Sequence, residues 1–127
     1  MPNITGLWQS KRTKVLQQVE PNQIKFIPVT EARIDIQQQG DFIVFKQLNQ
    51  TLFRQQNSTR LGVWQEGGKQ FLLSDDVDNS ISFIKVRKER NGVPVQLTYN
   101  YIQSGYNSGG KQTVVKSKLV RVNSLEI

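Results

Sequence analysis

Arg12 is the first residue of the chain whose type and position suggest chemistry. It lies in an apolar-alternating segment, where side chains of a strand point alternately to its two faces. An inward Trp8 therefore predicts that Ser10, Arg12 and Leu16 also point inward. A buried arginine is costly unless an anion neutralises it, and its planar guanidinium matches a carboxylate with two hydrogen bonds. Arg12 is thus a candidate anchor for a ligand carboxylate.

Two alternatives remain open for this arginine. A bulge after Trp8 would reverse the register of the strand and turn Arg12 outward. Alternatively, Arg12 forms an ion pair within the protein, with Asp35 or Glu31 as its partner. Either arrangement would remove Arg12 from a ligand site.

Tyr99 and Tyr101 are candidates for a binding surface. In the segment 94–103 they alternate with polar residues and share one face with Val95 and Leu97. Such a face is apolar but carries two phenol hydroxyls, which suits a cavity that also hydrogen-bonds its ligand. The alternative is that both tyrosines are ordinary core or rim residues.

The composition excludes several kinds of chemistry. The chain has 127 residues with no cysteine and no histidine, so disulfides, thiolate nucleophiles and Ser-His catalysis are impossible. The acidic turn at 75–78 lacks the glycine and distal glutamate of an EF-hand loop. We expect Asp75, Asp76 and Asp78 to be solvated, and we predict no metal site.

The elements that must position these residues are short strands. Apolar-alternating runs recur along the whole chain with turn residues between them, and no segment has a convincing helical period. Asn91-Gly92 is the strongest hairpin signal, because both residues tolerate the positive φ of a type I′ turn. A regular series of hairpins predicts an antiparallel meander that hides its edges by closing. We expect one all-β domain over residues 1–127, with runs at 4–17, 24–27, 33–38, 42–48, 51–56, 60–65, 70–74, 80–89, 94–103 and 112–123.

Gly6 and Trp8 near one end of the sequence and Arg121 near the other resemble a pattern of the calycin superfamily. In these lipocalin-like up-and-down β-barrels, the tryptophan of the first strand plugs one end of the barrel. An arginine of the last strand packs across its ring, a contact worth roughly 0.5–2 kcal/mol. The resemblance implies a closed antiparallel meander barrel that binds a small molecule.

A narrower resemblance joins the two ends of the chain. The sequence from Gly6 through Trp8, Ser10 and Arg12 to Thr13 is similar to the opening of the S-type phycobilin lyases. Residues 97–99 and 119–124 are similar to the late strands of the same family. These calycin-fold proteins attach open-chain tetrapyrroles to phycobiliproteins, so the resemblance implies a bilin lyase or chaperone with a bound phycobilin and no other cofactor.

The resemblance also implies roles for particular residues. Arg12 and Arg33 would hold the propionates of the bilin, and Asp35 would assist as the catalytic acid by protonating a pyrrole nitrogen. The partner would be an acidic phycobiliprotein, which suits a basic exterior. The aromatic residues expected to stack on the pyrrole rings are Trp64, Tyr99 and Tyr101.

The net charge of +7 leaves other partners open. It could serve solubility alone, an anionic or hydrophobic small molecule, or an acidic protein. A single-stranded nucleic-acid binder is the less favoured rival and would need exposed aromatic residues beside lysines. A filled barrel without a ligand is a third reading. No apolar segment approaches the roughly 18 residues of a membrane span, and no signal peptide is evident, so we expect a cytoplasmic protein.

Overall fold

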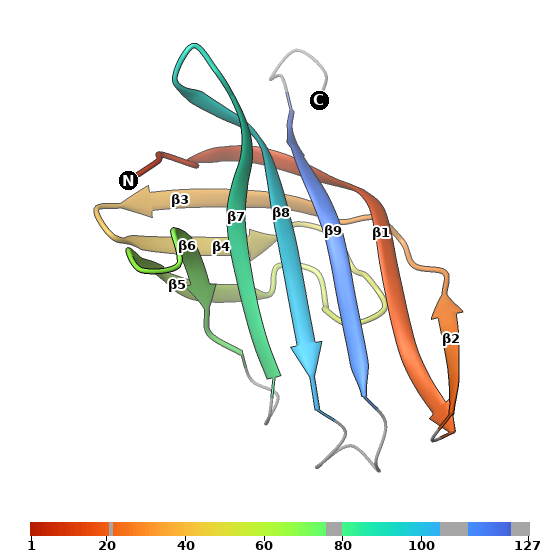
Figure 1. Ribbon diagram of the computed structural model, residues 1–127. Helices are drawn as coiled ribbons and strands as arrows, with labels where there is room; N and C mark the ends of the chain where they lie inside the picture. Colours follow the sequence, from red (N-terminus) through yellow and green to blue (C-terminus); the bar gives the residue numbers. More distant parts are fainter. Residues whose placement is uncertain (21, 76–79, 105–111, 123–127) are drawn as a thin grey trace.

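The protein is built from antiparallel strands (Figure 1). The computed structural model describes residues 1–20, 22–75, 80–104 and 112–122, and these contain no helix. No helix long and apolar enough to cross a membrane therefore occurs in this part of the chain. The strands are β1 (Gly6–Glu20), β2 (Gln23–Ile27), β3 (Arg33–Gln39), β4 (Phe42–Gln47), β5 (Thr59–Gln65), β6 (Gln70–Leu73), β7 (Ser80–Arg90), β8 (Val93–Gln103) and β9 (Thr113–Arg121).

The sheet closes into a barrel. Strands β3 to β9 pair in chain order, β1 pairs with β3 on one side, and β9 returns to pair with β1 on the other. Eight strands form this closed ring, and β2 pairs with β1 alone among the described strands. The predicted all-β, up-and-down antiparallel barrel is confirmed.

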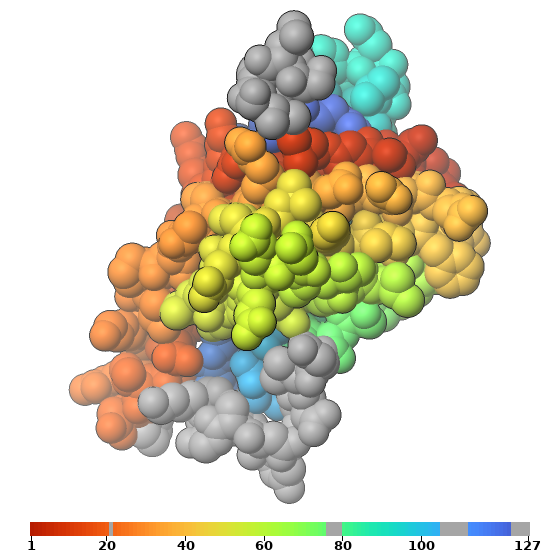
Figure 2. Space-filling view, turned by 180° about the vertical axis from the view of Figure 1, so that it is seen from behind, coloured from red at the N-terminus to blue at the C-terminus, as the bar shows by residue number. Residues whose placement is uncertain are grey.

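The first strand is long because it has two partners along one edge. Its beginning, Gly6–Gln9, pairs with β3, and its end from Val15 onward pairs with β2. The end of β1 and β2 therefore form a hairpin that extends a wall made with β7, β8 and β9 (Figure 1). Figure 2 shows the opposite side, which the orange and yellow segments of β3 and β4 cover.

A β-bulge at Arg12 corrects the expected register of β1. Lys11 lies opposite Lys118 and Lys14 opposite Lys116, so two residues of β1 face the single residue Ser117 between those partners. Arg12 takes a positive φ of 54° and is exposed. The extra residue reverses the alternation, so that Val15, 1% exposed, points inward. Arg12 and Leu16 do not, contrary to the expectation from continuous pleating.

Arg121 packs across the indole ring of Trp8 at one end of the barrel. Trp8 is fully buried and its indole N–H donates a hydrogen bond to the carbonyl oxygen of Ile4 at 3.0 Å. The guanidinium carbon of Arg121 lies 4.4 Å from the centre of the indole ring. Arg121 also donates hydrogen bonds to the carbonyl oxygens of Thr5, at 2.6 Å, and Pro94, at 2.8 Å. These bonds fix the guanidinium over the ring.

Gly6 completes this closure through its lack of a side chain. Its φ of 147° is one that other residues rarely adopt, and a Cβ there would overlap Nη1 of Arg121. The large core cluster continues from Trp8 through residues such as Ile36, Phe71 and Leu97.

Two connections test the turn predictions. Asn91 and Gly92 have φ values of 52° and 78° between β7 and β8, so the predicted hairpin is confirmed. The expected run at 51–56 is not a strand. Thr51 N–H donates to the carbonyl oxygen of Arg54 instead, and the amide of Gln47 bonds to the carbonyl of Asn49 and the hydroxyl of Thr51. These bonds hold the segment as a loop.

Candidate functional site

The barrel contains a cavity of about 200 Å³ at the end away from Trp8. The loop that carries Leu52 and Phe53 borders its open side, since both side chains line the cavity and are exposed. The remaining apolar lining residues are Val15, Val29, Ala32, Ile34, Phe45, Val115 and Leu119. The polar and aromatic ones are Ser10, Thr13, Thr30, Gln47, Thr51, Arg54, Arg60, Tyr99, Tyr101, Gln103 and Ser117.

Arg60 is the charged residue held deepest in this lining. Strand β5 places it opposite Phe45 of β4, on the inner face, where it is only 8% exposed. Its guanidinium carbon lies 5.1 Å from the ring centre of Phe45 and 5.4 Å from that of Tyr99. The two rings are stacked 6.0 Å apart at 21°. The cation is therefore held against two aromatic rings inside the barrel.

Neutral hydroxyl groups take the hydrogen bonds of Arg60. Nη1 donates to the hydroxyl of Ser82 at 3.0 Å, and Nη2 donates to the hydroxyl of Tyr99 at 2.8 Å. A guanidinium has five N–H donors, so these two bonds use only part of its capacity. They orient the side chain without neutralising its charge.

Asp75 is the carboxylate closest to this arginine. Its side chain is 4% exposed, and Oδ2 lies 3.6 Å from Nη1 of Arg60. Oδ1 lies nearer to Arg54, at 2.7 Å from Nη2. Asp75 is therefore shared between two guanidinium groups and bonds more closely to Arg54, so it compensates the charge of Arg60 only in part.

The acidic-turn expectation was wrong for Asp75, because this residue is buried in the ion-pair cluster rather than solvated. Asp76 and Asp78 lie outside the described residues. A solvated turn requires side chains that face water. The side chain of Asp75 points into the barrel instead and is 4% exposed. The tertiary pairing with Arg54 and Arg60 explains its position.

Tyr99 and Tyr101 both line the cavity, on the inner face that their alternation predicts. The hydroxyl of Tyr101 donates to Oε1 of Gln103 at 3.1 Å. Burial raises the pKa of Tyr101 above its ordinary value, and the nearby negative charge of Asp75 adds to this effect. The phenol is therefore kept neutral, and its one proton serves the hydrogen bond to Gln103.

The structure separates the other candidate residues from this cavity. Asp35 alternates with the buried Ile34 and Ile36 and so lies on the outer face of β3, together with Arg33. Arg12 is exposed at the bulge. Trp64 packs edge-on against Phe71, with ring centres 5.0 Å apart, and does not line the cavity. The carboxylate anchor and acid expected at Arg12, Arg33 and Asp35 are thus absent from this cavity.

Arg60 was missed as a candidate, although the sequence carries a signal for it. Arg60, Gly62 and Trp64 alternate along β5, so an inward Trp64 implies an inward Arg60. Gly62 is also on this face, where a Cβ would come within 2.7 Å of Ile43 Cγ1. Ser82 reaches Arg60 from β7, and Asp75 reaches it from the segment that follows β6, and such long-range contacts have no signal in the local pattern.

The sequence matches no model of a known protein family, and no curated protein matches it significantly. Interpretation of the cavity therefore depends on its own chemistry. Among the described residues no group of three or more acidic side chains could hold a metal ion.

Proposed function

We propose that this barrel binds a small amphipathic carboxylate, with Arg60 as the residue that receives the carboxylate group. The observation that carries the proposal is a guanidinium, 8% exposed, that faces an apolar cavity and donates its hydrogen bonds to two neutral hydroxyls. A carboxylate would complete the neutralisation that Asp75 provides only in part. The hydroxyl of Tyr99 is positioned to donate a further hydrogen bond to the same group.

The volume of the cavity limits the body of the ligand. A cavity of about 150 Å³ holds one benzene molecule, and the cavity here measures about 200 Å³. A single ring or a short alkyl chain fits beside the side chains of Ile34, Phe45 and Leu119. Longer ligands would extend through the open side, past Leu52 and Phe53.

An open-chain tetrapyrrole is the extended form of this proposal. One propionate-bearing ring would occupy the cavity, and the other three rings would lie at its open side or require the loop that carries Leu52 and Phe53 to move. The resemblance to phycobilin lyases supports this ligand, whereas the cavity volume favours a smaller one. We assign no reaction, because Asp35 lies on the outer face of the barrel.

Calorimetric titration with octanoate, and with octanol as its uncharged counterpart, tests the proposal. We expect octanoate to bind and octanol to bind at least tenfold more weakly, since a charge-assisted hydrogen bond contributes about 1.5–3 kcal/mol. Arg60→Gln should remove this preference, and Tyr99→Phe should reduce it with less effect on folding. Arg33→Gln, on the outer face, is the matched control. Equal affinities for acid and alcohol in the parent protein would refute the anchor.

Phycocyanobilin is the second ligand to titrate, followed through its visible absorbance. A shifted and sharpened band that Arg60→Gln abolishes would support the tetrapyrrole as the occupant. If octanoate binds and phycocyanobilin shows no spectral change, the ligand is a small carboxylate and the tetrapyrrole is excluded. If neither ligand binds, the barrel is filled by its own side chains and the proposal fails.

A further inference from the structure

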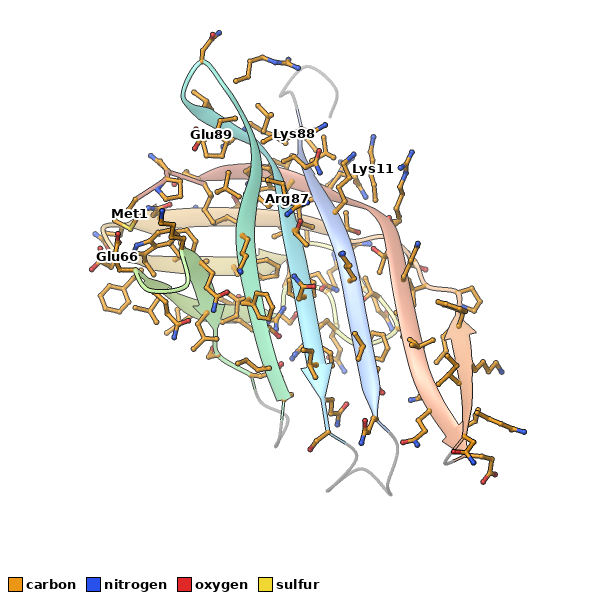
Figure 3. All side chains as sticks on the ribbon, viewed as in Figure 1. Met1, Lys11, Glu66, Arg87, Lys88 and Glu89 are labelled. Atoms are coloured by element: carbon orange, nitrogen blue, oxygen red, sulfur yellow. The ribbon has the colours of Figure 1, made fainter. Side chains whose placement is uncertain are left out.

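The outer face of the wall formed by β7, β8, β9 and β1 carries two rows of residues that together contain five lysines. The register aligns Lys85, Thr98, Lys118 and Lys11 across the four strands as the first row. The second row is Phe83, Asn100, Lys116 and Lys14. We call these the lysine rows. Figure 3 shows Lys11 on this wall, with Lys88 near its upper end.

Two pairs of lysines in these rows face each other directly. Lys11 lies opposite Lys118, and Lys14 lies opposite Lys116. Like charges in directly opposite positions destabilise a sheet. No described carboxylate forms an ion pair with any of the four, and the described acidic residues lie outside both rows. These lysine pairs therefore repel each other, and replacing one lysine by an acidic residue would remove the repulsion. Such a repulsion is expected where an anion from outside the protein binds the lysines.

A row of apolar side chains follows the lysine rows two residues further along the strands. The register aligns it through Leu16, half-buried, and the exposed Phe26 of β2. Phe26 is 67% exposed, and Ile81, Ile102 and Val114 are 43–45% exposed. Five adjacent strands make the row about 19 Å long. Its residues are Ile81, Ile102, Val114, Leu16 and Phe26.

We infer that this face docks on an anionic lipid bilayer, with the apolar row in the lipid interface and the lysine rows on the headgroup phosphates. Residues two positions apart on a strand are about 7 Å apart. An apolar surface that binds at the interface is buried about 5–10 Å below the headgroups. Lys14 and Lys116 are therefore close enough to the apolar row for their long side chains to reach the headgroup phosphates.

The composition of the face favours a bilayer over other anionic partners. Lysine is depleted in protein–protein interfaces, whereas lysines beside an anionic membrane each contribute about 1 kcal/mol. A single-stranded nucleic acid would require exposed aromatic rings beside the lysines for stacking, whereas the exposed ring of Phe26 lies on β2 at the end of the apolar row. The aromatic residue of the lysine rows, Phe83, is half-buried with Lys85 Nζ 5.9 Å from its ring centre. Aliphatic residues such as Ile102 and Val114 gain from lipid and not from phosphate.

Sedimentation with vesicles tests the inference in the full chain, whatever the cavity binds. The vesicles are phosphatidylcholine alone and phosphatidylcholine mixed with phosphatidylglycerol. We expect binding to the mixed vesicles only, and a loss of about 30-fold in the double variant Lys14→Gln/Lys116→Gln. The matched control Lys46→Gln/Lys69→Gln removes the same charge elsewhere on the molecule and should cost less than about threefold, because distant charges are screened.

The apolar row has its own matched pair of variants. Phe26→Ser should weaken vesicle binding at least about tenfold, since burial of a phenylalanine contributes about 1.5–3 kcal/mol. Phe42→Ser replaces a ring that is 64% exposed on β4 and should have no effect. Thermal denaturation of each variant confirms that it folds.

Three results would overturn the inference. Equal losses in the two lysine doubles would mean that net charge alone attracts the protein to the vesicles. Equal binding to vesicles with and without phosphatidylglycerol would exclude a role for the lysine rows. A parent protein that binds a single-stranded oligonucleotide through Lys14 and Lys116 but no vesicle would show a nucleic-acid surface instead.

Discussion

The hydroxyl oxygen of Thr13 lies 2.7 Å from that of Ser117, across the bulge between β1 and β9. This hydrogen bond keeps Thr13 on the inner face and leaves Arg12 as the extra residue that turns outward. The one extra residue of the bulge therefore keeps Arg12 out of the barrel, and Arg60 is the buried arginine instead. The strand presents two small hydroxyl side chains to the cavity, and the buried cation comes from β5 instead.

We predict that Arg12→Gly stabilises the protein by about 1 kcal/mol, because Arg12 has a φ of 54° that only glycine adopts without strain. Arg12→Val should destabilise it, since a β-branched residue tolerates this conformation least. Urea denaturation measures both. Lys14→Gly, at an extended position of the same strand, is the control and should lower the free energy of unfolding.

Trp8 and Arg121 should behave as one unit. Trp8→Ala should cost about 3–5 kcal/mol, as expected for a large buried aromatic residue. Arg121→Ala should cost less, and the double variant should lose less than the sum, because the second substitution has no ring left to uncover. Chemical denaturation of the four proteins completes the cycle. Strictly additive losses would contradict the stacked arrangement.

Gly62 should not tolerate a side chain. A Cβ there would lie 2.7 Å from Ile43 Cγ1 and 2.9 Å from Leu73 Cδ2. Gly62→Ala should therefore lower the free energy of unfolding by about 1–3 kcal/mol through overpacking. Gly67→Ala is the control, since its Cβ would meet no atom within 4 Å. Similar thermal midpoints for the two variants would show that the interior can expand at Gly62.

Stability should decline in alkaline solution through Tyr101. Burial raises the pKa of this phenol above its ordinary value near 10. Above that pH the unfolded chain loses the proton first, so the folded state binds more protons and the free energy of unfolding falls. The contribution is complete below pH 10 and disappears as the pH rises through the folded-state pKa. Tyr101→Phe should show a shallower decline, and an unchanged slope would exclude this residue as the cause.

Lys14→Gln should raise the thermal midpoint at low ionic strength. It removes one of two like charges that face each other across β1 and β9, which is worth about 0.2–1 kcal/mol. Added salt should shrink the difference, since ions screen exposed charges. Lys69→Gln, in the turn between β5 and β6, should change the midpoint less. A difference that persists in high salt would point to packing rather than repulsion.

Local alternation predicted the parts of this fold that depend on a strand's own pattern. The inner faces of β8 and β9 follow from a period of two. The contact of Arg121 with Trp8 was expected from the resemblance to calycins instead. The bulge at Arg12 remained one of two alternatives, because the residue types around an inserted position do not reveal it. The apolar pair Leu52 and Phe53 predicted a strand, but the side-chain bonds of Gln47 form a loop there.

The candidate site was predicted less well than the fold. Tyr99 and Tyr101 were placed on the cavity, whereas Arg60 was overlooked even though its alternation with Trp64 marks the inner face. Asp75 read as a surface residue because local sequence cannot show that Arg54 and Arg60 lie beside it. Ion pairs between segments distant in the sequence depend on the tertiary arrangement, which no single segment encodes.

The division of β1 between two partners lets part of the sheet open without unfolding of the barrel. Since β2 hydrogen-bonds to the ring through β1 alone among the described strands, β2 can separate from β1 while all eight strands of the ring stay paired. Val29, which follows β2, lines the cavity, so this motion widens the entrance. Amide hydrogens of β2 should therefore exchange with solvent sooner than those of β3 to β9, which exchange only when the barrel opens as a whole.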